Sequence, residues 1–369
     1  MGLSRLGLYI EQSDERNYDG ILKEESVVGL STQKDIIKTK ADLQGVNLTS
    51  YKLFPPMSFA YVPDTSRRGD KVALAFNMTE ETYIISSIYV VFKVTSLEVL
   101  DPWYLFMFFN RPEFDRYARF NSWGSARETF NWEDMCNIVI ELPPLPIQQK
   151  YVDIYKSMVA NQQSYERGLE DLKLVCDGYI EDLRRKLPCE KIGRYLRSCN
   201  QRNDNNLVTL FQGITVDHVF TDPKRIAEDA ENGSVVRTGQ FAFNKVMKAH
   251  NTKLPIALRE GADCVVSSSY QVFEVCDKEK LLPKYLLLWL NRTETERYAG
   301  FIAFGTTRDI FSFENLCEIA IPIPNIDIQQ SIVEIFEVYQ KRCSINIKMI
   351  SLIKDICPIL IKGSLEEGR

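Results

Sequence analysis

Apolar residues recur at alternating steps of four and three along residues 147–188, directly after Pro146. Only Gln162 interrupts this apolar seam, and the pattern is typical of a helix that packs along one partner helix. Pro188 lacks the N–H that a continuing helix needs, so we expect the helix to end near residue 187. The positions expected to carry the helix–helix packing are Tyr155, Met158, Tyr165, Leu169 and Leu172.

A second seam with the same spacing runs through residues 327–369. Asp327 is the predicted N-cap of this helix, and Pro358 is predicted to kink or end it. Neither helix is apolar all round, so the simplest arrangement packs the two against each other as an antiparallel coiled coil. Two core helices of one bundle remain an alternative. The packing positions of the second seam are Phe336, Tyr339, Ile350 and Ile353.

The second seam belongs to a longer internal repeat. From about residue 83 onward the chain resembles itself 181 positions later over about 90 residues, so that Tyr104 corresponds to Tyr285. The repeat includes two strand-like segments, 85–94 and 266–275, which are rich in β-branched and aromatic residues. We therefore predict duplicated α/β (α+β) domains, related by a pseudo-two-fold internal repeat and each followed by a long helix.

The composition is that of an ordinary soluble globular protein. The 369 residues are 45% hydrophobic and 26% charged, and a net charge of -5 does not by itself indicate nucleic-acid binding. We see neither a signal peptide nor a membrane span and expect a cytoplasmic protein with no membrane partner. Nine cysteines without a C-x-x-C pair, and two histidines without metal-site spacing, predict reduced thiols and no metal site. Motifs for a phosphate loop, a dinucleotide site or a nucleophile elbow are absent, so we predict no catalytic residue.

A basic loop lies between two strand-like segments of each half, and these loops are the first candidates for DNA contact. Arginine can read guanine and lysine neutralises phosphate, so two loops of different composition could read two different short sequences. Solvated loops without a binding role remain the alternative. The candidate residues are Arg67, Arg68 and Lys71 in loop 61–71, and Lys245, Lys248, His250 and Lys253 in loop 244–253.

A glycine-containing turn in each half is the second candidate. The turns end in Arg127 and Arg308, which could approach a phosphate backbone closely. Each arginine could instead pair with a glutamate of its own half, Glu133 or Glu314. The aromatic residues of the two turns are expected to pack inside the protein rather than to stack on bases, namely Trp123 and Phe304.

The order of α/β domain, long helix, second α/β domain and second helix resembles the specificity subunits of type I restriction-modification systems. The proline-rich runs 142–149 and 321–330 each lead into a helix start that contains glutamine, which resembles the signature of that family. The Leu6-Gly7 and Ile192-Gly193 openings and the strand 89–92 also resemble it. The resemblance covers essentially the whole chain.

The resemblance implies four segments. These are a first target-recognition domain at 1–146, a first spacer helix at 147–188, a second target-recognition domain at 189–326, and a second spacer helix with a C-terminal tail at 327–369. Each domain would read one half of a bipartite site in double-stranded DNA. The helices would set the spacer between the half-sites and dock two methyltransferase (modification) subunits.

The resemblance also implies that the chemistry belongs to partner subunits. Methylation would be carried out by the methyltransferase subunits, and cleavage by restriction (translocase) subunits where these join. S-adenosylmethionine, ATP and magnesium would be bound by the partners, and this chain would hold no cofactor. Two other classes of function stay open, a coiled-coil scaffold without a DNA role and a self-contained DNA-modifying enzyme.

Overall fold

The computed structural model describes residues 2–39, 41–65, 71–124, 127–204, 206–223, 233–247, 253–303 and 309–369. These residues form two compact units, Met1–Glu166 with Ile345–Arg369, and Arg167–Ser344. Each unit contains helices and antiparallel strands, which confirms the predicted mixed α/β content.

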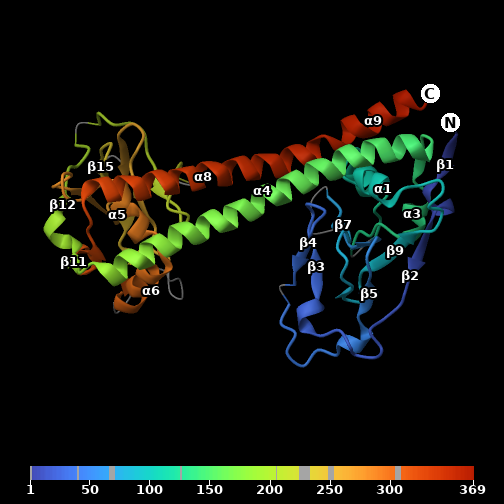
Figure 1. The fold of residues 1–369 in the computed structure, drawn as a ribbon, viewed down its shortest axis with the longest axis horizontal. Coiled ribbons are helices and arrows are strands. Elements are labelled where there is room, and N and C mark those ends of the chain that lie inside the picture. Colours follow the sequence, from blue (N-terminus) through green and yellow to red (C-terminus); the bar gives the residue numbers. More distant parts are fainter. Residues whose placement is uncertain are drawn as a thin grey trace. The chain divides into compact units, whose positions relative to one another are not determined.

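A four-stranded antiparallel sheet forms the middle of the first unit (Figure 1). The strands, in order across the sheet, are β2 (Ile10–Ser13), β9 (Val90–Val94), β6 (Ser58–Tyr61) and β7 (Leu74–Phe76). Their register places Phe59 between Phe76 and Phe92. The Phe59 ring stacks on these two rings with centroid distances of 4.7 and 5.0 Å. Cross-strand aromatic pairs of this kind make one face of the sheet a continuous apolar surface.

Helix α1 (Pro102–Phe109) covers this aromatic face. Asp101 caps the helix by accepting a hydrogen bond from the backbone N–H of Trp103 at 2.8 Å, and Pro102 fits the first turn. Phe109 meets the ring of Phe59 edge-on at 5.7 Å, so the helix closes the core over the sheet. Two further helices follow, α2 (Pro112–Phe120) and α3 (Trp132–Cys136).

Three strand pairs complete the first unit. They are β1 (Leu3–Arg5) with β10 (Val139–Glu141), β3 (Val28–Leu30) with β4 (Ile36–Lys38), and β5 (Lys52–Phe54) with β8 (Tyr83–Ile85). Leu30, Phe54 and Ile85 from the last two pairs join a smaller core on the other face of the sheet. Both faces of the sheet are therefore covered by apolar side chains.

The second unit repeats this architecture. Its four-stranded sheet contains, in order, β12 (Leu196–Cys199), β20 (Tyr270–Val275), β16 (Phe241–Asn244) and β18 (Ile256–Leu258). The stacked rings of Phe241 and Phe273, 4.9 Å apart, take the places of Phe59 and Phe92. The helices that correspond to α1, α2 and α3 are α5 (Pro283–Leu290), α6 (Thr293–Ile302) and α7 (Phe313–Cys317).

Four strand pairs lie around the second sheet. They are β11 (Cys189–Lys191) with β22 (Ala320–Pro322), β13 (Gly213–Ile214) with β14 (Phe220–Thr221), β15 (Ser234–Val236) with β19 (Cys264–Val266), and β17 (Val246–Met247) with β21 (Asp309–Ile310). The first three correspond to the three pairs of the first unit.

The two long helices of the chain are α4 (Leu145–Lys186) and α8 (Ile326–Asp355). The expected range 147–188 begins two residues after the observed start of α4, and the expected range 327–369 begins one residue after the start of α8. As predicted, the second helix breaks near Pro358: α8 ends at Asp355, and Pro358 lies in the first turn of a separate helix, α9 (Cys357–Glu367). A proline in the first helical turn needs no N–H donor, whereas one inside a helix removes a hydrogen bond.

A buried glutamine fastens the start of each long helix to its own unit. The Gln148 amide donates hydrogen bonds to the carbonyls of Val99 and Pro143 at 2.7 and 2.8 Å, and its Oε1 accepts one from the backbone N–H of Asp101 at 3.0 Å. Gln329 makes the equivalent three bonds in the second unit. Both glutamines are 0% exposed, so each satisfies three backbone groups that no water reaches.

The seam of α4 is buried within the first unit against α8 and α9. Tyr155 and Ile353 belong to the core of this unit, and the Gln162 amide donates to Asn346 Oδ1 at 3.1 Å. The polar residue that interrupts the seam is therefore paired with another polar residue. Ile350 departs from the prediction, because it is 37% exposed and faces an open cleft, while the seam passes through Asn346 and Ile353.

The seam of α4 changes position within the second unit. Leu169 and Cys176 are buried, but the next buried positions are Ile180 and Leu183, and Tyr179 is exposed. A straight helix has about 3.6 residues per turn, so a strict seven-residue pattern drifts around its surface. The other predicted packing positions are partly buried, namely Met158, Tyr165, Leu172, Phe336 and Tyr339.

Candidate nucleic-acid interface

The two candidate segments of the first unit meet at one edge. The backbone N–H of Phe130 donates to the Pro63 carbonyl at 2.9 Å, and the N–H of Thr65 donates to the Glu128 carbonyl at 3.0 Å. These bonds join the start of loop 61–71 to the residues that follow the turn 121–127. Loop and turn are separate candidates in the sequence, and the fold makes them neighbours.

The corresponding segments of the second unit meet in the same way. The backbone N–H of Phe311 donates to the Lys245 carbonyl at 2.9 Å. The strand pair β17–β21 then places Val246 opposite Ile310 and Met247 opposite Asp309. Loop 244–253 contains β17 and turn 302–308 leads into β21, so the two segments share one strand pair. We call this edge of each unit the loop–turn edge.

Some of the predicted contact residues are placed by the structure. Lys71 and Arg127 are exposed at the loop–turn edge of the first unit, and Lys253 is exposed in the second. Lys245 is half-buried, with its backbone N–H and carbonyl both bonded within the unit. The remaining predicted contact residues lie outside the described residues, namely Arg67, Arg68, Lys248, His250 and Arg308.

The turn of the first unit depends on Gly124. Its φ of +149° is rarely adopted by residues with a side chain, and a Cβ there would lie 1.9 Å from the carbonyl oxygen of Arg127. The chain can therefore reverse sharply only with glycine at this position. Among the described ion pairs, Arg127 has none with Glu133; the neighbouring Glu128 pairs instead with Arg119.

Trp123 was expected to pack inside the protein, and this expectation is wrong. The residue is 67% exposed, although its backbone forms an isolated bridge with Thr129. The bridge fixes the backbone while the indole faces solvent. The corresponding residue of the second turn, Phe304, lies outside the described residues.

A buried ion pair anchors the far end of loop 61–71. Lys34 Nζ lies 2.5 Å from Asp115 Oδ1 on α2 and donates to the Val72 carbonyl at 3.0 Å. Asp115 Oδ1 also accepts a hydrogen bond from the Val72 N–H at 3.0 Å. Burial lowers the pKa of Lys34 from its ordinary value of 10.5, and Asp115 partly offsets that fall.

The second unit has an anchor of the same form. His218 Nε2 lies 3.4 Å from Glu296 on α6, and Nδ1 lies 3.1 Å from the carbonyl of Ile256 in β18. His218 and Lys34 both adopt positive φ, 61° and 67°, in the turns of the hairpins β13–β14 and β3–β4. Sequence reasoning missed both pairs, because each joins residues far apart in the chain and none falls in a hydrophobic pattern or a motif.

A cleft of about 660 Å³ adjoins the first loop–turn edge. Charges of both signs line it: Lys34, Lys71 and Arg116 face it together with Asp35 and Asp115. Among the described residues, no group of three or more histidine, cysteine or acidic side chains could hold a metal ion. The mixed charge gives the cleft no built site for a metal or a single anion.

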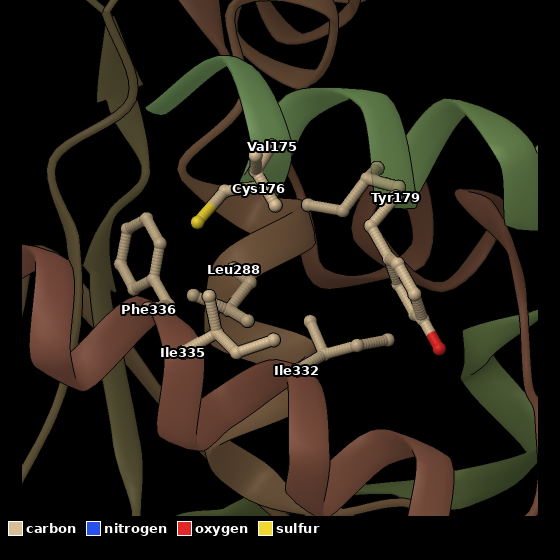
Figure 2. A pocket seen from close by; sticks show the side chains of 8 residues that line it. Val175, Cys176, Tyr179, Leu288, Ile332, Ile335 and Phe336 are labelled. Carbon is tan, nitrogen blue, oxygen red and sulfur yellow. The ribbon is translucent and has the colours of Figure 1, made fainter. Parts of the chain in front are cut away.

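An apolar pocket lies within the second unit where α4, α5 and α8 meet (Figure 2). Cys176 and Val175 on α4 face Leu288 on α5 and Ile332 and Phe336 on α8. Its volume of about 10 Å³ is at the lower limit for holding a single water molecule. We interpret it as a packing gap between helices rather than a ligand site.

The described helices do not include one that is long and apolar enough to cross a membrane.

Comparison with known proteins points to one family. Residues 238–355 match the model of the type I restriction modification DNA specificity domain. No curated protein sequence matches the chain.

Two solved structures resemble the chain over almost its full length. The first is the S subunit of a type I restriction-modification system from M. genitalium, at 10% sequence identity and a TM-score of 0.54, covering 99% of this chain and 95% of that one. The second is a chain solved in work on complex assembly and conformational transition of the type I R-M system, at 14% identity and a TM-score of 0.50, covering 99% and 97%. The predicted resemblance to specificity subunits is confirmed.

Proposed function

We infer that this chain is the DNA specificity subunit of a type I restriction-modification complex. The match of residues 238–355 to the DNA specificity domain carries the inference. Each of the two units would read one half of a bipartite site in double-stranded DNA. The chain itself would be non-catalytic, and methylation would take place on partner subunits that bind S-adenosylmethionine.

The two loop–turn edges support recognition by both halves. In each unit a loop and a turn from distant parts of the sequence meet at one edge, beside cationic residues such as Lys71, Arg127 and Lys253. The loops differ in composition although their positions correspond. Two modules of the same fold with different contact loops can read two different half-sites.

The long helices support docking of two modification subunits. Outward-facing apolar residues remain exposed on them, including Leu174 on α4 and Leu352 on α8. Apolar residues without a partner on a helix face are typical of a protein–protein interface. The helices would also act as a rigid spacer, so a change in their length would change the spacing between half-sites that the complex accepts.

Co-expression with a type I methyltransferase subunit from the same genome tests the inference. The pair should co-purify, and single-molecule sequencing of the host DNA should show methylation at one bipartite motif. The matched control expresses the methyltransferase subunit alone, which should methylate no such motif. A stable complex without sequence-specific methylation, or no complex at all, would contradict the inference and favour the scaffold alternative.

A further inference from the structure

Two phenylalanines occupy corresponding exposed positions in the two units. Phe120 is 75% exposed at the end of α2, and Phe301, 181 residues later, is 85% exposed near the end of α6. Single exposed apolar residues are common, but an exposed phenylalanine at the same place in both halves of a repeat is not explained by packing.

An arginine accompanies each phenylalanine one helical turn earlier. Arg116 precedes Phe120 by four residues, and Arg297 precedes Phe301 by four. Residues four apart lie on the same face of a helix, and all four of these side chains are exposed. The opposite face of α2 is buried through Phe114 and Ala118, so the helix holds the arginine–phenylalanine face toward solvent.

Both phenylalanines lie beside a loop–turn edge. After Phe120 the chain enters the turn whose Trp123 pairs with Thr129, and Thr129 in turn bridges Asp64 of the loop. Phe301 directly precedes the second turn, whose strand β21 pairs with β17. Each phenylalanine is therefore adjacent in the chain to a segment proposed for DNA contact.

We propose that Phe120 and Phe301 stack on bases of duplex DNA at the edges of the two half-sites, with Arg116 and Arg297 against the neighbouring phosphates. The proposal rests on the proposed function. Base-reading residues must differ between the halves, as the two loops do, whereas stacking on a base is tolerant of sequence and can use the same residue in both. In a duplex the faces of the bases are already stacked, so each ring would enter as a wedge between base steps, which bends the duplex and brings more of it against the protein.

The test uses the complex with the methyltransferase subunits and a duplex that carries the motif found by sequencing. The duplex carries 2-aminopurine at the edge of one half-site or the other, because its fluorescence reports local unstacking. Phe120→Ala and Phe301→Ala should each weaken binding about tenfold and reduce the 2-aminopurine signal at their own half-site only. The methylated motif should remain the same, since stacking does not read sequence.

Two kinds of control keep the result specific. Phe120→Tyr and Phe301→Tyr retain the ring and should bind DNA like the unchanged protein. Tyr18→Ala removes a ring that is equally exposed, at 74%, but lies elsewhere in the first unit, and should have no effect. All these side chains are exposed, so the thermal unfolding midpoint should not change.

Wild-type affinity and an unchanged 2-aminopurine signal in both alanine variants would overturn the stacking proposal and leave the proposed function intact. Loss of methyltransferase binding with unchanged DNA affinity would also overturn it and assign the rings to a protein interface. If the unchanged complex bound no duplex specifically, both proposals would fall together.

Discussion

Replacing Gln148 with leucine removes three buried hydrogen bonds without much change in volume. The substitution leaves the carbonyls of Val99 and Pro143 and the N–H of Asp101 without partners. Gln148 is fully buried, so water cannot replace the lost bonds without opening the unit. The adjacent Gln149 is exposed, which makes Gln149→Leu the matched control.

The expected loss of stability is about 3 kcal/mol. A buried polar group left without a partner costs about 1–3 kcal/mol, so three such groups cost about 5 kcal/mol together. Burying an apolar side chain in place of the amide returns about 2 kcal/mol. The Gln149→Leu control should change stability by less than about 0.5 kcal/mol, as surface substitutions usually do.

Urea unfolding followed by tryptophan fluorescence measures this loss for each unit. Trp103, Trp123 and Trp132 report the first unit, and Trp289 is the tryptophan of the second. Gln148→Leu should shift the transition of the first unit. Equal effects of Gln148→Leu and its control, or a loss below about 1 kcal/mol, would show that other groups can satisfy these three backbone atoms in place of glutamine.

Three further predictions concern local packing and the chemistry of buried side chains. Asp115→Asn should destabilise the first unit by about 3 kcal/mol at pH 7, because it leaves the ammonium of Lys34 buried without its partner. Asp115 partly offsets the lowering of the Lys34 pKa by burial, so in the variant this lysine should lose its proton at a lower pH than in the unchanged protein. The loss of stability should therefore shrink as the pH rises toward 10.5, as compared by circular dichroism melts of the two proteins. A loss independent of pH would contradict the assignment. Gly193→Ala should lower the melting temperature, because the added Cβ would lie 2.7 Å from the Cβ of Cys317. In the control Gly168→Ala, within α4, the added Cβ meets no atom within 4 Å, and this variant should raise the melting temperature because alanine favours the helix. The opposite order of melting temperatures would contradict this packing. Burial raises the pKa of Cys357 to about 12, so this thiol should not react with iodoacetamide at pH 8, whereas exposed cysteines should. Mass spectrometry of the labelled protein measures the modification at each cysteine. Rapid labelling of Cys357 in the folded protein would contradict its burial.

The long helices could be predicted from sequence because their evidence is local and repeated. The spacing of apolar residues located both helices to within one or two residues at their starts, and Pro358 located the break. The exposure of Ile350 could not be predicted in this way. A strict seven-residue pattern ignores that a helix with about 3.6 residues per turn rotates its apolar positions gradually around its axis. It also does not contain the hydrogen bond between Gln162 and Asn346, which fixes the residues that face each other across the two helices.

The loop–turn edges could be predicted only in part. Composition identified a loop and a turn in each half, but their meeting depends on backbone hydrogen bonds between residues more than sixty positions apart, such as Thr65 and Glu128. The anchoring pair of Lys34 and Asp115 is also non-local. The two adjacent glutamines at 148 and 149 were visible in the sequence, but only the fold shows that Gln148 is the buried one.

Exchange of residues 1–146 for the recognition domain of another specificity subunit tests the central claim most directly. The chimaera and the unchanged chain are each expressed with the methyltransferase subunit, and the methylated motifs are compared by single-molecule sequencing. We expect one half-site to change while the other half-site and the spacer length remain. Alteration of both half-sites, or of neither, would contradict the assignment of one half-site to each unit.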